Sequence, residues 1–136
     1  MTHLEEHSLP YMDKALPDAW KAATTFASAS TGLSSAEGEI IKIRVSQLNG
    51  CVFCLDLHSR QARKLGVPQQ KLDLLPAWRE STLFSDREAA LLAVAETATT
   101  LPLSEDSKAD LHAARSALGQ EAFVSAESAA PTIHIF

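Results

Sequence analysis

The chain has 136 residues and a formal net charge of −5, from 12 basic and 17 acidic residues. This length predicts one domain, residues 1–136, that can bury a core without a metal or a disulfide. No basic run is present, which argues against a nucleic-acid partner, and no apolar stretch approaches the roughly 18 residues of a membrane span. The N-terminus lacks the basic start and apolar stretch of a secretory signal, so we expect a cytoplasmic location.

The first half of the chain is predicted to begin with two helices. Apolar residues recur at helical spacing from about residue 17 to 30, and Pro17 suits the first turn. The next helix is expected at about 35–48, because Ser34 and Glu37 have the spacing of a capping box. Its run IIKIRV is rich in β-branched residues, as strands are, but the capping signal and the length favour a helix.

A third helix is predicted from about residue 51 to 65. Asn49 and Gly50 precede it as a turn, and Asn49 is expected to be its N-cap. Gly66 is the candidate C-cap, and Pro68 prevents the helix from continuing.

Helix signals continue through the second half of the chain. Capping-box spacing between Ser85 and Glu88 predicts the start of one helix, Ser104 opens another, and Pro131 is expected to interrupt the last. The expected ranges are about 69–75, 85–99, 104–118 and 120–130. Since no segment has the alternation of a convincing strand, the predicted fold class is all-α.

Residues 51–58, CVFCLDLH, contain both cysteines of the chain. On a helix, Cys51, Cys54 and His58 are at i, i+3 and i+7, so they share one face. The first turn of a helix lowers the pKa of a cysteine, and His58 can serve as the base for Cys54, directly or through a water. In a reducing compartment, such a pair more often serves catalysis or metal binding than structure.

Two other interpretations of this motif remain open. A zinc site needs three or four ligands, and this stretch supplies three. The chain has no second CxxC, and its other histidines are scattered, at His3, His7, His112 and His134. Inert buried cysteines are common, although they do not require a helix start, an Asn-Gly turn and an in-phase histidine. We predict no metal site and no bound cofactor.

Glu39 lies twelve positions before Cys51, which gives the pattern E-x11-C-x2-C-x3-H. A glutamate in a helix is most often solvated. If the second and third helices form an antiparallel hairpin, Glu39 lies toward the end far from the turn, and contact with the cysteines would require a bend. The periodicity therefore leaves open whether Glu39 faces the thiols.

The stretch EIIKIRVSQLNGCVFCLDLHSRQARKLGV resembles the core of the alkylhydroperoxidase AhpD-like family, within the carboxymuconolactone decarboxylase superfamily. The segment LFSDREAALLAVAETAT is similar to the helices that follow in this family, and the resemblance covers about residues 16–130. It implies an AhpD-like helical bundle with the CxxC motif at the N-terminus of a central helix. It also implies assembly into homo-oligomers (dimers, trimers or hexamers) and the reduction of hydroperoxides by the CxxC pair.

Through this resemblance, Cys54 corresponds to the peroxidatic cysteine and Cys51 to the resolving cysteine, with Glu39 and His58 as a proton relay. The helix dipole alone favours Cys51 as the nucleophile. The histidine favours Cys54, and we follow the histidine and the family. The implied reductant is an external dithiol, such as a lipoyl group on a carrier protein.

The chain departs from the family pattern in two places. Phe53 stands where some members carry a second relay histidine, which implies a shorter relay. The end of the chain, with Pro131, differs from the longer last helix that is usual in similar proteins.

The predicted function is a thiol-dependent hydroperoxide reductase. The alternatives are a carboxymuconolactone-type decarboxylase, which needs no cysteine pair, a thiol–disulfide switch without turnover, and a zinc-binding structural protein. Asp56 and Arg60 are expected to be solvated helix charges, and Glu88 is expected to be the capping partner of Ser85.

Overall fold

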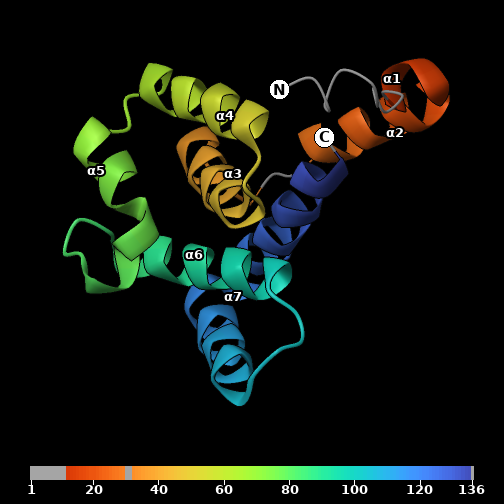
Figure 1. Ribbon diagram of the computed structural model, residues 1–136. Coiled ribbons are helices and arrows are strands. Elements are labelled where there is room, and N and C mark those ends of the chain that lie inside the picture. The colour runs from red at the N-terminus through yellow and green to blue at the C-terminus, as the bar shows by residue number, and fades with distance from the viewer. Residues whose placement is uncertain (1–11, 30–31, 136) are drawn as a thin grey trace.

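The computed structural model describes residues 12–29 and 32–135, and over these residues it shows helices and no strand (Figure 1). The elements in chain order are α1 (Met12–Ala15), α2 (Pro17–Ser28), α3 (Ser35–Asn49), α4 (Val52–Lys64), α5 (Gln69–Leu74), the 3-10 helix η2 (Leu75–Glu80), α6 (Asp86–Thr99) and α7 (Glu105–Ile135). The predicted all-α fold is confirmed. Within the described ranges, every helix is too short or too polar to cross a membrane.

The central helix is α3, which packs against α4, α6 and α7 (Figure 1). Ile41 and Val45 join an apolar cluster with α6 and α7, whereas Ile40 and Ile43 join a second cluster with α5, η2 and α6. Each such buried side chain contributes about 1.5–3 kcal/mol relative to an exposed one. Burial on several sides explains why the run IIKIRV forms a helix despite its β-branched residues.

Capping boxes begin α3 and α6, as predicted. The Ser34 hydroxyl accepts from the Glu37 N–H at 3.1 Å, and the Glu37 carboxylate accepts from the Ser34 N–H at 2.9 Å. Ser85 and Glu88 make the same reciprocal pair. Arg87 Nε also donates to Glu37 at 2.7 Å, and this hydrogen bond lowers the pKa of the Glu37 carboxyl. The N-terminal ends of α3 and α6 are therefore joined to each other.

The turn between α3 and α4 differs from the prediction. α3 continues to Asn49, and Gly50 adopts a left-handed conformation with φ 66° and ψ 29°. Cys51, rather than Asn49, is the N-cap of α4, and its sulfur accepts from the Cys54 N–H at 3.3 Å. Glycine suits this position because it has no Cβ to oppose a positive φ. The turn makes α3 and α4 a tight antiparallel hairpin.

The long helix α7 is interrupted at Gly119, where φ is 76° and ψ is 171°, in agreement with the break expected there. The interruption expected at Pro131 is wrong, because α7 continues to Ile135. Pro131 is exposed, whereas Ala126 and Ala130 are fully buried. The packing of this part of α7 outweighs the backbone hydrogen bond that a proline removes.

α1 and α2 project from the rest of the molecule, and α2 contacts the C-terminal half of α7 (Figure 1). No residue of α2 is buried. After α2 the chain passes close to α7, where the Gly32 N–H donates to the Ser125 hydroxyl at 3.2 Å. A Cβ at Gly32 would lie 2.6 Å from that oxygen and 2.7 Å from the Glu121 carbonyl, so this approach requires glycine.

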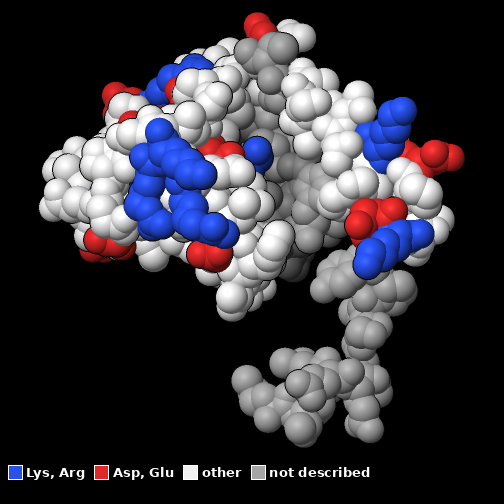
Figure 2. Space-filling model, turned by 90° about the horizontal axis from the view of Figure 1, so that it is seen from above, with Lys and Arg blue, Asp and Glu red and all other residues white. Residues whose placement is uncertain are grey.

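The outer face of α4 carries exposed basic residues, including Arg60, Arg63 and Lys64. Figure 2 shows basic and acidic side chains interspersed over the face seen from above. Arg60 pairs with Asp56 at 2.7 Å, and both side chains are more than half exposed. The prediction of solvated helix charges is confirmed for this pair.

Candidate active site

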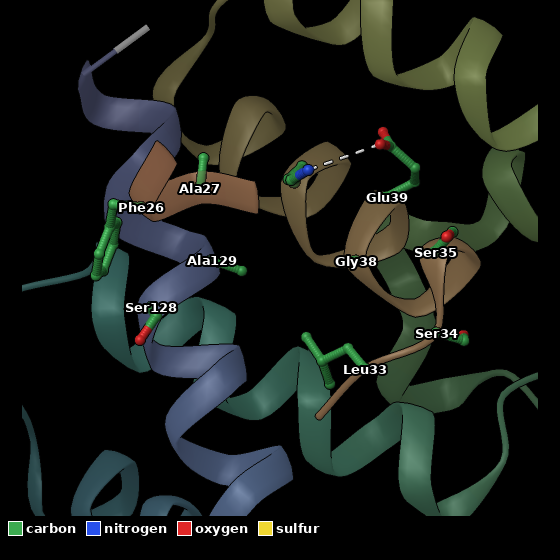
Figure 3. Close-up of a pocket in the computed structure, with 10 residues that line it drawn as sticks. Phe26, Ala27, Leu33, Ser34, Ser35, Gly38, Glu39, Ser128 and Ala129 are labelled. Atoms are coloured by element: carbon green, nitrogen blue, oxygen red, sulfur yellow. Dashed lines mark ion pairs between the residues drawn. The ribbon is translucent and has the colours of Figure 1, made fainter. Parts of the chain in front are cut away.

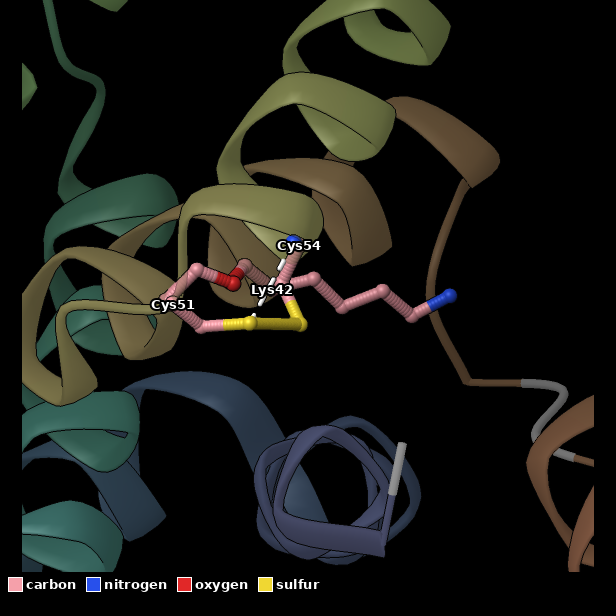
Figure 4. Close-up of a disulfide and its surroundings, with 4 residues drawn as sticks. Lys42, Cys51 and Cys54 are labelled. Carbon is pink, nitrogen blue, oxygen red and sulfur yellow. Dashed lines mark hydrogen bonds between the residues drawn. A yellow bond between two sulfur atoms is a disulfide. The ribbon is translucent and has the colours of Figure 1, made fainter. Parts of the chain in front are cut away.

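Cys51 and Cys54 are joined by a disulfide at the start of α4 (Figure 4). Their Cα atoms are 5.4 Å apart, within the range that a disulfide spans. Cys54 is only 2% exposed, whereas Cys51 is partly exposed. Val52 and Phe53, between them, are 80% and 70% exposed. Of the two sulfur-bearing residues, Cys51 therefore faces the surface and Cys54 faces the core.

Glu39 and His58 are in direct contact across the hairpin. His58 Nδ1 lies 2.7 Å from Glu39 Oε2, and the two side chains are 12% and 9% exposed. A carboxylate only accepts, so the hydrogen bond places the proton on Nδ1 and leaves Nε2 able to accept a proton. The glutamate thus reaches the histidine that follows Cys54 by four residues, through the register of the two helices.

The same face of α3 carries Lys42 and Ser46, at i+3 and i+7 from Glu39. Lys42 Nζ lies 3.7 Å from Glu39 Oε1. Ser46 is fully buried, and its hydroxyl donates to the Lys42 carbonyl at 2.6 Å. The Ser46 carbonyl in turn accepts from the Cys51 N–H at 3.1 Å. This stripe of α3 therefore fixes both the first cysteine and, through Glu39, the histidine.

Lys42 lies at the level of Cys54 in this arrangement. The hairpin is antiparallel, so residues in order along α3 face residues in reverse order along α4. At one end Glu39 contacts His58, and at the other Ser46 contacts Cys51. Lys42 falls between those ends on α3, as Cys54 does on α4. Figure 4 accordingly shows the Lys42 side chain in the surroundings of the disulfide.

A pocket of about 190 Å³ opens beside this stripe, between α2, the first half of α3 and the end of α7 (Figure 3). Glu39 and Lys42 form its charged side, and their ion pair is the dashed line in Figure 3. The apolar side chains of the pocket wall are those of Phe26, Ala27, Leu33 and Ala129. The pocket therefore offers an apolar wall next to a carboxylate and an ammonium group.

The structure brings the four predicted site residues, Glu39, Cys51, Cys54 and His58, into one hairpin. Lys42 is not among the predicted site residues, although its i+3 spacing from Glu39 is a signal that the sequence contains.

Other candidate residues lie away from this hairpin or form other contacts. Glu88 pairs with Lys71 in addition to its capping role, and His112 is exposed on α7. His3 and His7 lie outside the described residues. Over the ranges that the structure describes, no three His, Cys, Asp or Glu residues are grouped so as to hold a metal ion.

Sequence comparisons find relatives in two bacteria. The carboxymuconolactone decarboxylase family model matches residues 14–97, which include the whole hairpin. The uncharacterized protein YdfG of Bacillus subtilis (strain 168) is 41% identical over 86 residues, which are 63% of this chain and 58% of YdfG. The uncharacterized protein YnjA of Escherichia coli (strain K12) is 34% identical over 67 residues, 49% of this chain and 37% of YnjA. Each alignment spans less than two thirds of the relative's own length.

A solved structure extends the likeness to nearly the whole chain. It is that of a protein of unknown function from Agrobacterium tumefaciens, which its description relates to the antioxidant defence protein AhpD. The TM-score is 0.77 and the sequence identity 30%, over 93% of this chain and 88% of the other. Because the likeness covers 93% of this chain, the folds agree beyond residue 97 and into α7. The family model matches more than half of this chain, and the AhpD-like helical fold agrees with it. The chain therefore belongs to the carboxymuconolactone decarboxylase family.

Proposed function

We propose that the protein is a thiol-dependent hydroperoxide reductase in which Cys54 attacks the peroxide and Cys51 resolves the product. One observation carries this proposal. The buried cysteine of a disulfide-bonded pair lies one helical turn before His58, which a buried carboxylate holds at 2.7 Å. The relation of the Agrobacterium structure to antioxidant defence supports the same chemistry.

The cycle begins with the reduced cysteine pair. Glu39 accepts the Nδ1 proton of His58 in a hydrogen bond, so that Nε2 takes the proton of the Cys54 thiol, directly or through a water. The Cys54 thiolate attacks the terminal oxygen of the hydroperoxide. An S–O bond forms while the O–O bond breaks, and the leaving alkoxide takes a proton from His58 and departs as an alcohol. Cys54 is then a sulfenic acid.

Cys51 completes the reaction. Its thiol attacks the sulfur of the Cys54 sulfenic acid, water leaves, and the disulfide forms. An external dithiol returns two electrons, and itself becomes a disulfide, by attacking the more exposed sulfur of Cys51 and expelling Cys54 as a thiolate. A lipoyl group on a carrier protein has this chemistry.

The test is peroxide consumption by the purified protein with dihydrolipoamide, beside Cys51→Ser and Cys54→Ser. Turnover is expected to vanish in both variants, because each lacks one partner of the disulfide. A sulfenic-acid trapping reagent is expected to label Cys51→Ser, which keeps Cys54, and not Cys54→Ser. The chain has two cysteines, so a trapped sulfur is assigned without ambiguity.

Other outcomes lead to other functions. A wild type that forms the disulfide with peroxide but shows no turnover with dithiols is a thiol–disulfide switch rather than an enzyme. The family name supports a second candidate, a carboxymuconolactone-type decarboxylase. Decarboxylation that survives Cys54→Ser, in a protein that does not consume peroxide, would favour that candidate.

A further inference from the structure

Lys42 has no part in the reaction described above, although it lies within the site. Its ammonium nitrogen is 3.7 Å from Glu39 Oε1, which is too long for a hydrogen bond, and its side chain is 27% exposed. A partly exposed ion pair of this kind contributes about 0–1 kcal/mol to stability. Stability therefore gives little reason for a long cationic side chain at the level of the buried cysteine.

The surroundings of Lys42 have the composition of a substrate site. Its ammonium group borders a pocket whose other side is the apolar wall of Phe26, Leu33 and Ala129 (Figure 3). Figure 4 shows its side chain beginning near Cys54, with the ammonium group extending beyond the two sulfurs. A molecule with a polar end near Lys42 and an apolar body against the wall fits this arrangement.

We propose that Lys42 is a further catalytic residue, whose ammonium group binds the leaving oxygen of a small organic hydroperoxide held in this pocket. The inference rests on the proposed peroxidase function. When the O–O bond breaks, negative charge develops on the leaving alkoxide before His58 protonates it. A cation at the edge of a pocket with an apolar wall stabilises that charge, and its three N–H donors are not held by a hydrogen bond to Glu39.

The volume of the pocket defines the substrate class. At about 190 Å³ it is slightly larger than a cavity of about 150 Å³ that accepts benzene, and smaller than the 300–1,000 Å³ or so of sites for drug-sized ligands. A group the size of one phenyl ring, as in cumene hydroperoxide, fits these dimensions.

The first experiment varies the leaving group. The rate of oxidation of the reduced protein is measured in single turnovers with cumene hydroperoxide and with peracetic acid, for the wild type and Lys42→Met. Methionine keeps much of the length of the side chain and removes its charge. Acetate is a far more stable anion than the cumyl alkoxide, so it depends less on a cation as it leaves. Lys42→Met is expected to slow the reaction with cumene hydroperoxide about 100-fold. The reaction with peracetic acid is expected to slow only about 10-fold.

Equal slowing with both oxidants would overturn the role of Lys42, because a change that acts through Cys54 or Glu39 affects both reactions alike. Lys42→Arg is expected to restore most of the rate, since it restores the charge. The matched control is Lys64→Met, which removes an exposed lysine from the end of α4 and is expected to leave both rates unchanged.

The second experiment fills the pocket. Gly38 lines it, and a Cβ at this position would meet no atom within 4 Å. Gly38→Leu therefore extends into open space while replacing a glycine inside α3 with a better helix former. It is expected to raise KM for cumene hydroperoxide about 10-fold. The KM for hydrogen peroxide is expected to stay the same, since hydrogen peroxide has no apolar group to place against the wall. Gly38→Ala is the matched control. Unchanged kinetics with both peroxides, or an equal loss with both, would show that the substrate does not bind in this pocket.

The failure of this inference differs from the failure of the proposed function. If no peroxide oxidises the wild type, the proposed function fails and the inference fails with it. If the wild type reacts and Lys42→Met slows both oxidants equally, the peroxidase stands and only the role of Lys42 fails.

Discussion

Glu39 and Glu96 are both enclosed by packed helices, but their surroundings differ. Glu96, on α6, accepts hydrogen bonds from Trp78 Nε1 at 2.8 Å, Arg44 Nε at 3.0 Å and Arg79 at 3.1 Å. Burial opposes its charge, yet these hydrogen bonds prevail and the pKa of Glu96 lies below its ordinary value. Glu96 thereby joins α6 to α3 and η2. Its arginine donors stay charged at all ordinary pH values, and the indole N–H of Trp78 does not ionise.

Glu39 is the more buried of the two, with a side chain 9% exposed against 21% for Glu96. Its close partner is His58, and Lys42 lies farther away at 3.7 Å. Histidine can gain and lose a proton near neutral pH, which neither arginine nor tryptophan does. The comparison separates a carboxylate that holds helices together from one that directs a proton in the proposed reaction, and substitutions at each test that separation.

The largest effect is expected at Glu39. Glu39→Gln should lower kcat/KM for peroxide about 100-fold, because an amide can accept from His58 Nδ1 but has no charge to stabilise the protonated imidazole. The free energy of unfolding should change by less than about 1 kcal/mol, since the two side chains have nearly the same shape. Steady-state kinetics and urea denaturation on one preparation measure both quantities.

A double-mutant cycle is the control for this prediction. If Glu39 acts through His58, the variant with both Glu39→Gln and His58→Gln should lose little more activity than the worse single variant. Fully additive losses would mean that Glu39 acts independently of the histidine, and the proposed relay would have to be abandoned.

Glu96→Gln should have the opposite profile. Loss of the charge from a group bound by two arginines and an indole is expected to lower the free energy of unfolding by about 1–3 kcal/mol. The kcat/KM of the remaining folded protein should be unchanged, because Glu96 lies outside the pocket and the hairpin stripes. A fall in kcat/KM comparable to that of Glu39→Gln would contradict the assignment of Glu96 to stability alone.

The stability difference between the wild type and Glu96→Gln should depend on pH. Folding lowers the pKa of Glu96, so its contribution is fully present above the unfolded pKa and is lost as the pH falls through the folded pKa. Urea denaturation at several values between about pH 7 and about pH 3 should therefore show the difference narrowing on acidification. A constant difference over this range would contradict the assignment of the charge to the fold.

The smallest effect is expected at Asp56, an exposed carboxylate on the same helix as His58. Its pair with Arg60 at 2.7 Å is well solvated, and such pairs contribute little. Asp56→Asn should leave both peroxide turnover and the urea midpoint within experimental error of the wild type. This variant provides the baseline for charge removal from α4, against which the other two glutamates are judged.

Signals confined to a few residues predicted much of the fold. The capping boxes at Ser34 and Ser85 operate within one turn, so the sequence contains all that is needed to find them. The same locality explains the error at Asn49, which is typical of an N-cap. Asn49 is instead the last residue of α3, and the left-handed Gly50 ends that helix. Cys51 is therefore the N-cap of α4.

The candidate site was only partly predictable from the sequence. Helical spacing placed Cys51, Cys54 and His58 on one face, because that requires one helix alone. The contact of Glu39 with His58 depends on the register between α3 and α4. That register cannot be derived from the periodicity of either helix alone. The role of Pro131 was misjudged for a related reason, since the packing of its neighbours on α7 is a tertiary effect.

The chemical groups of the site and the walls of its pocket come from different parts of the chain. Glu39, Cys54 and His58 lie within the single α3–α4 hairpin, whereas Phe26 and Ala129 reach the pocket from α2 and α7. Substitutions at these two positions can reshape the pocket without altering a contact inside the hairpin. Descendants of one ancestral protein can therefore diverge in the molecules they accept while inheriting the same reactive hairpin.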